Sequence, residues 1–239
     1  MRIMQEPAYV LHQHAYSETS LLLELFTRLH GKVGVVAKGA RRPRSPLHAA
    51  LIPFQPLSVS FTGRGELPTL TSAEPLMPAP VLAGPLLFCG LYLNELLQRL
   101  LHRHDPHERL FEQFSQALNQ LPDSATPEPV LRLFEKRLLE EIGYGLVLEH
   151  EADSGAVIAP ASRYRYLSER GPMPYTPGGE GIPVHGSTLL ALSVERLEDT
   201  TVLQEAKQLL RALLARQLGD RPLASRDLFQ PAAAHNTLE

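Results

Sequence analysis

The hydrophobic pattern of this 239-residue chain changes its period at a cluster of prolines, Pro75, Pro78 and Pro80. Before the cluster, short apolar or β-branched runs are separated by Gly and Pro, a pattern typical of β-strands. After it, apolar residues recur about every 3.6 positions, as they do along a helix. We therefore expect an α+β multidomain chain in which residues 1–80 form the first domain and residues 81–239 the second.

The first domain contains the pattern of five short strands. The expected strands are Ala8–His12, Ser20–Arg28, Lys32–Ala37, Leu57–Thr62 and Thr69–Ser72, with a hairpin turn at His30–Lys32. About five strands in about 75 residues favour a small closed barrel, and the five-stranded oligonucleotide-binding (OB) barrel is the leading interpretation. An SH3-like barrel is the main alternative.

The second domain is expected to be mostly helical. Leu86–Leu101 is apolar on nearly all sides, which predicts a central packing helix with the single cysteine, Cys89, buried in it. A further amphipathic helix is expected over Thr200–Leu218, with Leu203, Ala206, Leu210, Leu213 and Leu214 facing inward. The segment Gly145–Pro183 is rich in Gly and Pro, so we expect an irregular insert with a strand at Ser162–Leu167.

Another helix has clear signals at both ends. Thr126 is the expected N-cap, Pro127 the first helical residue and Gly143 the stop. Between them, Leu131, Phe134, Leu138 and Ile142 form the expected core stripe. On this pattern Arg132, Lys136 and Arg137 point elsewhere.

Charge is divided unevenly along the chain. The net charge of −3 conceals 8 Lys/Arg against 5 Asp/Glu in residues 1–80 and 15 against 21 in the rest. No acidic residue occurs between Glu24 and Glu66, whereas seven cations do: Arg28, Lys32, Lys38, Arg41, Arg42, Arg44 and Arg64. Such a segment is typical of a surface that binds a polyanion through its phosphates.

Four of these cations fall in one segment, Lys38–Pro46, whose Gly and Pro content predicts an exposed loop. Arg64 lies between Gly63 and Gly65, where a backbone can approach a phosphate closely. The alternative is a solvated basic loop that only keeps a sheet edge soluble. Binding of a small phosphate compound or an acidic protein also stays open.

Common catalytic and anchoring signals are missing from the sequence. One cysteine can form neither an internal disulfide nor a Cys-rich zinc site, and no phosphate-loop, nucleophile-elbow or HExxH motif is found. The His102–Glu108 run is interpreted as a surface loop rather than a metal site, and the Glu205–Lys207 resemblance to a nuclease motif is discounted because it lies on a helix. We expect no secretory signal and no spanning helix.

Several short motifs carry a family resemblance. At Tyr16–Ser20 and Val36–Arg41 the sequence resembles the bacterial RecO recombination mediators, and the match covers nearly the whole chain. Other segments similar to that family are Pro53–Phe54, Gly63–Glu66, Ser72–Glu74, Gly90–Leu96, Pro127–Pro129, Leu131–Arg132, Phe134–Glu135 and Gly143–Gly145.

The resemblance implies an N-terminal OB barrel followed by a helical domain, and a DNA repair role that is not enzymatic. RecO-like proteins bind single- and double-stranded DNA and anneal strands coated by single-stranded-DNA-binding protein. With RecR they help to load RecA. The resemblance implies no cofactor and a cytoplasmic, nucleoid-associated location, and we expect a monomer when the protein is alone.

The resemblance also assigns roles to individual residues. Lys38, Arg41, Arg42 and Arg44 match the family's basic barrel loop and should contact DNA phosphates. Arg132 matches an arginine that receives the acidic tail of single-stranded-DNA-binding protein, and Lys136 is expected beside it. The four-cysteine zinc site of some relatives is missing here, so zinc is not expected.

Two other classes of function stay open at this point. One is a metal-dependent DNA-processing enzyme that uses unrecognised carboxylates. The other is an adaptor that binds only proteins, with its basic segment serving as a soluble edge.

Overall fold

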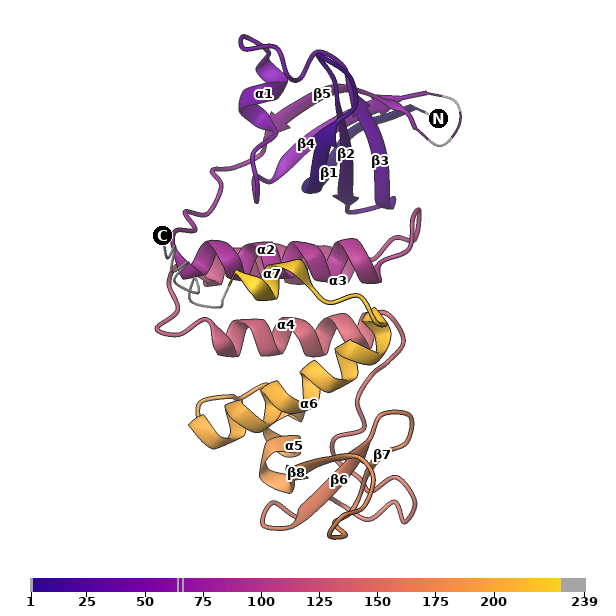
Figure 1. Ribbon diagram of the computed structural model, residues 1–239, viewed down its shortest axis with the longest axis vertical. Helices are drawn as coiled ribbons and strands as arrows, with labels where there is room; N and C mark the ends of the chain where they lie inside the picture. Colours follow the sequence, from indigo (N-terminus) through magenta and orange to yellow (C-terminus); the bar gives the residue numbers. More distant parts are fainter. Residues whose placement is uncertain (1, 64, 66, 229–239) are drawn as a thin grey trace, which may run out of the picture. The chain divides into compact units, whose positions relative to one another are not determined.

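The computed structural model describes residues 2–63, 65 and 67–228, which fall into two compact units. The first unit contains the residues up to Asp123 together with the segment from Pro222 onward. The second unit is Ser124–Arg221. Figure 1 labels the helices and strands of both.

A closed five-stranded barrel begins the first unit (Figure 1). Its strands are β1 (Arg2–Ala15), β2 (Leu21–Thr27), β3 (Gly31–Ala37), β4 (Leu57–Thr62) and β5 (Thr69–Pro75). They close in the order β1-β2-β3-β5-β4, and only the β3–β5 pairing is parallel. A short helix, α1 (Pro46–Ala50), follows β3 in the chain and contacts β5. This arrangement confirms the expected OB barrel.

The first strand is longer than the sequence predicted. β1 pairs with β4 over Arg2 to Ala8 and with β2 over Ala8 to Ala15, with register shifts in both pairings. One strand therefore closes the barrel by serving two neighbours in succession. The prediction covered only Ala8–His12 because just that part carries a continuous apolar run.

Alternating side chains from every strand fill the barrel. The buried core comprises residues such as Leu23, Leu25, Val33, Val35, Val59 and Phe61, all fully buried. Each pair is two positions apart on one strand, so both members point to the same face. The core thus follows from the period-two pattern of the sequence.

The hairpin between β2 and β3 turns at residues 28–30, two positions before the expected His30–Lys32 turn. The hydroxyl of Thr27 donates to the Gly31 carbonyl oxygen (2.7 Å) and accepts from the His30 N–H (3.2 Å). Gly31 already pairs with Thr27 as the first residue of β3. The Thr27 hydroxyl therefore fixes the turn two positions earlier than the glycine suggested.

Two helices of the first unit, α2 (Pro85–Leu100) and α3 (Glu108–Gln120), pack on the outside of the barrel. The Tyr9 ring of β1 lies edge-on to Phe114 of α3 at 5.1 Å between centroids, and its hydroxyl donates to Ser115 Oγ at 2.8 Å. The Asn94 amide of α2 donates to the Val10 carbonyl oxygen at 3.4 Å. Helix α2 is the expected central helix, and Cys89 is buried in it as expected.

The α2–α3 connection is the surface loop that the His102–Glu108 run predicted. Residues 102–106 are exposed. The loop also pairs with the barrel, because the His104 N–H donates to the Lys32 carbonyl oxygen (3.1 Å) and Arg103 forms an ion pair with Glu24. The last described helix of the first unit is α7 (Ala224–Asp227), whose Ala224 N–H donates to the Glu95 carboxylate of α2 at 2.8 Å.

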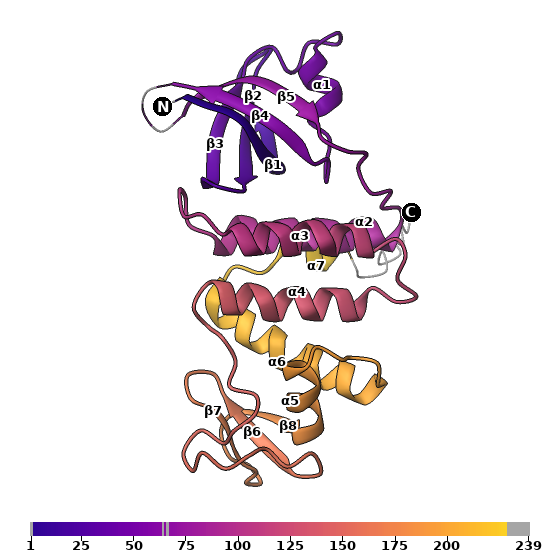
Figure 2. The ribbon, with the colours of Figure 1, turned by 180° about the vertical axis from the view of Figure 1, so that it is seen from behind.

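The second unit combines helices with a small sheet. Its elements are α4 (Glu128–Glu141), β6 (Arg163–Leu167), β7 (Gly171–Pro174), β8 (Ile182–His185), α5 (Gly186–Ser193) and α6 (Thr200–Leu218). The strands form an antiparallel sheet in the order β7-β6-β8, and β8 packs against α5 and α6 (Figure 2). Helix α6 has the predicted bounds, with Leu209 buried in addition to the expected stripe and Leu203 only partly buried.

The insert expected over residues 145–183 is only partly irregular: residues 145–162 contain no helix or strand, but a three-stranded sheet begins at Arg163. The strand expected at Ser162–Leu167 exists as β6, but two further strands pair with it. The partner strands were missed because each has four residues and contains proline. Their backbones pair with the two edges of β6, a contact that local composition does not reveal.

Helix α4 begins and ends close to the prediction. Its cap position is occupied by Pro127, with no side-chain capping bond, so the expected Thr126 cap is wrong by one residue. At the other end Gly143 donates to the Glu140 carbonyl oxygen (3.2 Å) and Tyr144 to that of Leu139 (2.7 Å). These two bonds define a Schellman motif and confirm Gly143 as the stop.

Candidate nucleic-acid interface

Four exposed cations lie on the connection between β3 and α1. We call Lys38, Arg41, Arg42 and Arg44 the basic loop, and all four side chains are exposed. The loop has an ordered backbone, because the Arg42 N–H donates to the Gly39 carbonyl oxygen (3.1 Å) and the Ser45 N–H to that of Arg42 (2.9 Å). Ala40, in its middle, is fully buried in the barrel core. The exposed loop predicted from Gly, Pro and charge is therefore confirmed.

Arg41 joins the basic loop to the β1–β2 connection. Its N–H donates to the Thr19 carbonyl oxygen (3.0 Å), and its Nη1 donates to the Ser17 carbonyl oxygen (2.7 Å). These bonds fix the direction of the guanidinium while the side chain stays in contact with solvent. A cation held in this way loses less conformational entropy when it binds a phosphate.

The other three cations of the basic loop share one cavity of about 590 Å³. Lys38, Arg42 and Arg44 line it together with Leu47 and part of β5, including Glu74. Three cations against one carboxylate leave a positive concave surface beside the barrel. Such a surface attracts a phosphate backbone without requiring any particular base.

Arg28 is placed away from the basic loop. Its Nη2 forms an ion pair with Glu112 of α3 at 2.8 Å, and its Nε lies 3.8 Å from Glu108. Arg28 is in the β2–β3 turn, whereas the basic loop leaves the far end of β3. The sequence prediction grouped Arg28 with the basic loop because no acidic residue occurs between Glu24 and Glu66. The fold, however, brings two carboxylates of α3 next to Arg28.

Lys32 is engaged by α2. Its Nζ donates to the Gln98 carbonyl oxygen at 2.5 Å, and burial lowers the pKa of the ammonium despite the opposing effect of Glu24. Lys32 and Lys38 lie at opposite ends of β3, about 20 Å apart along an extended strand. The structure therefore does not bring Lys32 together with the basic loop. Arg64, the seventh predicted cation, lies outside the described residues.

The two residues expected to receive a peptide tail are both buried on α4. Arg132 is 3% exposed, and its Nη2 forms an ion pair with Glu135 at 2.5 Å. Among the described residues, Nε and Nη1 of Arg132 have no hydrogen-bond partner. Lys136 donates to Glu195 at 3.1 Å and forms an ion pair with Glu140 at 2.9 Å.

Two cations of α4 share one carboxylate that the sequence did not indicate. Glu195 follows α5, accepts from both Lys136 and Arg137, and has its pKa lowered first by the hydrogen bond from Arg137. No local signal could reveal it, because its partners are 58 and 59 residues away in the chain.

The described part of the chain holds neither a cluster of metal-ligating side chains nor a membrane-spanning helix. Over residues 2–63, 65 and 67–228, no three His, Cys, Asp or Glu side chains are grouped closely enough to hold a metal ion. Glu205 belongs to the nuclease-like motif that the sequence analysis discounted. Its carboxylate accepts from the His185 N–H (3.0 Å) and from Thr188 Oγ1 (2.6 Å), and these two bonds hold the start of α5. None of the described helices combines the length and the apolar character needed to cross a bilayer.

Together these features define an OB-barrel protein with an ordered basic loop and an appended helical region. Two family models match the chain, Recombination protein O N terminal over residues 1–79 and Recombination protein O C terminal over residues 84–227. The chain belongs to the RecO family.

Curated relatives agree along nearly the full length. DNA repair protein RecO of Nitrosococcus oceani is 49% identical over 231 residues, covering 96% of this chain and 94% of the relative. The same-named protein of Methylococcus capsulatus is 49% identical over 232 residues, covering 97% and 95%. That of Alkalilimnicola ehrlichii is 46% identical over 235 residues, covering 97% and 93%.

Proposed function

We propose that this chain is a non-enzymatic recombination mediator that binds single- and double-stranded DNA. It anneals complementary strands coated by single-stranded-DNA-binding protein and, with RecR, promotes RecA loading. The observation that carries the proposal is the basic loop, four exposed cations on an ordered backbone at one end of an OB barrel. Membership in the RecO family supports the same role.

Phosphate contacts suit an annealing protein. Cations that bind the backbone hold two strands near each other and leave the base edges free to pair. The affinity comes from release of counterions, so it should fall steeply with salt and depend little on sequence. No nucleotide hydrolysis and no cofactor is required for this chemistry.

The acidic tail of single-stranded-DNA-binding protein is proposed to bind at Arg132. Glu135 accepts from Nη2 of this guanidinium, and the Nε and Nη1 atoms have no hydrogen-bond partner among the described residues. A terminal carboxylate can accept a charge-assisted hydrogen bond from either of these two N–H donors. Because Arg132 is buried, the side chains that cover it must move when the tail binds. Lys136 adds positive charge beside it.

In this proposal the protein acts in the cytoplasm on the nucleoid. It is a monomer when alone and joins complexes with RecR. The test is the rate at which complementary oligonucleotides coated by single-stranded-DNA-binding protein anneal, with and without this protein and with no nucleotide added. Acceleration is the expected result. If naked DNA is bound and annealing is not accelerated, the tail site is wrong. If DNA is not bound, the mediator proposal fails and the protein-only adaptor replaces it.

A further inference from the structure

A second cavity is lined by Arg41 and by none of the three cations that line the first, Lys38, Arg42 and Arg44. It has a volume of about 380 Å³, within the range of about 300–1,000 Å³ typical of small-molecule sites. Its lining residues come from β1, β2, the basic loop and the segment around the end of α1: Gln13, Leu21, Arg41, His48, Leu51, Ile52 and Pro53.

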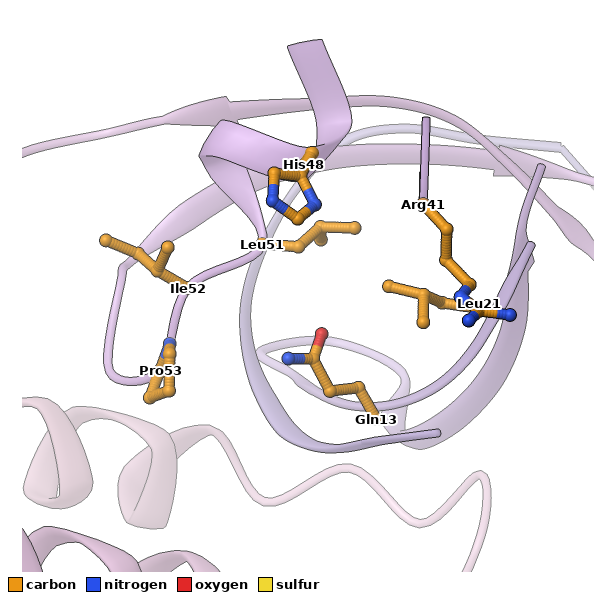
Figure 3. Close-up of a pocket in the computed structure, with 7 residues that line it drawn as sticks. All are labelled: Gln13, Leu21, Arg41, His48, Leu51, Ile52 and Pro53. Atoms are coloured by element: carbon orange, nitrogen blue, oxygen red, sulfur yellow. The ribbon is translucent and has the colours of Figure 1, made fainter. Parts of the chain in front are cut away.

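Figure 3 shows how these side chains are arranged. Leu21 and Leu51 approach the cavity from opposite sides, and the Gln13 amide is directed up between them. His48 lies at the α1 side, across from Arg41. The cavity thus has Leu21 and Leu51 as apolar walls with the Gln13 amide between them, and the His48 imidazole and the Arg41 guanidinium at its sides. No carboxylate is among the seven lining residues.

The walls differ in rigidity. Leu51 is 3% exposed and packs in the barrel core, and Leu21 packs partly buried against the same core. Gln13 is exposed on β1, so its amide is free to choose its partner. Arg41 is held by Ser17 and Thr19 at the edge of the cavity. The site is therefore largely formed before any ligand arrives.

We propose that this cavity holds one unpaired nucleobase of single-stranded DNA while Arg41 binds the phosphate of the same nucleotide. The inference rests on the proposed DNA-binding function and adds a base contact to it. A base has apolar faces that suit the Leu21 and Leu51 walls. Its edge carries both donors and acceptors, and a glutamine amide can satisfy either kind.

The same geometry excludes paired bases. A base in a duplex is stacked on both faces and hydrogen-bonded along its edge, so it can enter a cavity only after it is flipped out and has lost its stacking and pairing. Gln13 alone cannot distinguish all four bases, because its amide can rotate to match each edge. The cavity therefore favours single strands over duplexes without selecting a sequence.

The test compares two strands that share a backbone. One is an oligodeoxythymidine, and the other has the same length with every base replaced by an abasic sugar. The full-length protein should bind the base-containing strand about tenfold more tightly, because the apolar faces of one base are removed from water against Leu21 and Leu51. Gln13→Ala combined with Ile52→Ala should reduce that preference severalfold while changing affinity for the abasic strand less than about twofold.

Arg42→Ala is the matched control, because Arg42 belongs to the basic loop but does not line this cavity. It should weaken binding of both strands equally. Equal affinity of the unmodified protein for the two strands would overturn the base site and leave DNA binding by the basic loop intact. Failure to bind either strand would instead overturn the proposed function. An unchanged melting temperature of the Gln13 and Ile52 variant excludes misfolding as the cause of its effect.

Discussion

Arg41 and Ser17 join two loops at one end of the barrel, where Arg41 Nη1 donates to the Ser17 carbonyl oxygen at 2.7 Å. The basic loop and the β1–β2 connection are thereby held together. A contact between residues 24 positions apart thus fixes the direction of a cation that sequence alone shows only as a member of a charged run.

Lys32 lies on β3 and Lys38 directly follows that strand, so the two lysines form a matched pair for mutation. Lys38→Ala should weaken DNA binding and reduce the dependence of log affinity on log salt by about 1, with unchanged stability. Lys32→Ala should leave DNA affinity within about twofold and cost about 1.5–3 kcal/mol of stability, because the Gln98 carbonyl loses a charged donor. Fluorescence anisotropy and denaturant unfolding measure the two effects. Equal loss of DNA binding in both variants would contradict the assignment.

Arg132 should be a stability residue as well as a tail-binding residue. Arg132→Ala leaves the fully buried Glu135 without the guanidinium it pairs with, and we expect a loss of about 3–5 kcal/mol. Replacing both residues, as Arg132→Met with Glu135→Leu, should cost less than the single change. Urea unfolding checks this order. If the single variant is fully stable, the buried pair does not contribute to the stability of the protein. Any loss of tail-peptide binding by that variant then reports on the tail site directly.

Glu195 should make the second unit sensitive to acid. The hydrogen bond from Arg137 holds its pKa below the ordinary value of 4.5. Its contribution is therefore present above about pH 4.5 and lost as the pH falls through the lower, folded-state pKa. Glu195→Gln should be less stable than the unmodified protein at about pH 7, and this difference should shrink towards about pH 3.

Glu198 is the control for this titration, because it is exposed three residues further along the chain. Glu198→Gln should leave the pH profile of stability unchanged. A constant difference between the Glu195→Gln variant and the unmodified protein at all pH values would mean that the carboxylate is not coupled to Arg137 and Lys136.

Alanine substitutions at Gly31 and Gly39 distinguish the cost of backbone strain from the cost of a steric clash. Both have positive φ, of 64° and 72°. A Cβ on Gly31 would lie 2.0 Å from the Asp105 carbonyl oxygen, whereas one on Gly39 meets nothing closer than 3.8 Å. Gly39→Ala should cost about 1–2 kcal/mol from conformation alone. Gly31→Ala should cost clearly more, as thermal unfolding will show, and equal costs would mean that the α2–α3 loop does not pack on the barrel.

The barrel could be predicted from sequence because its order is local: each strand carries its own alternation, and five such runs leave few ways to close. Helix α4, which Gly143 stops, could be predicted because its apolar stripe and its end signals are also local in the sequence. The small sheet could not, since β7 and β8 are short and proline-containing and gain their structure from pairing with β6. The predicted domain boundary near residue 80 stays a prediction.

The site was predicted less completely than the fold. Exposure of Lys38, Arg41, Arg42 and Arg44 follows from loop composition, which is visible in sequence. The engagement of Lys32 with Gln98 and of Arg28 with Glu112 involves partners 66 or more positions away. A charge count treats all these cations alike, and only the packing of α2 and α3 on the barrel separates them.

The central claim is that the basic loop binds DNA phosphates, and the salt dependence of binding tests it most directly. Affinity for a single strand should be measured across a salt series for the unmodified protein and for the variant with Arg41, Arg42 and Arg44 all changed to Ala. The account predicts weaker binding of every sequence and a slope of log affinity against log salt that is smaller by about 2. An unchanged slope would contradict it.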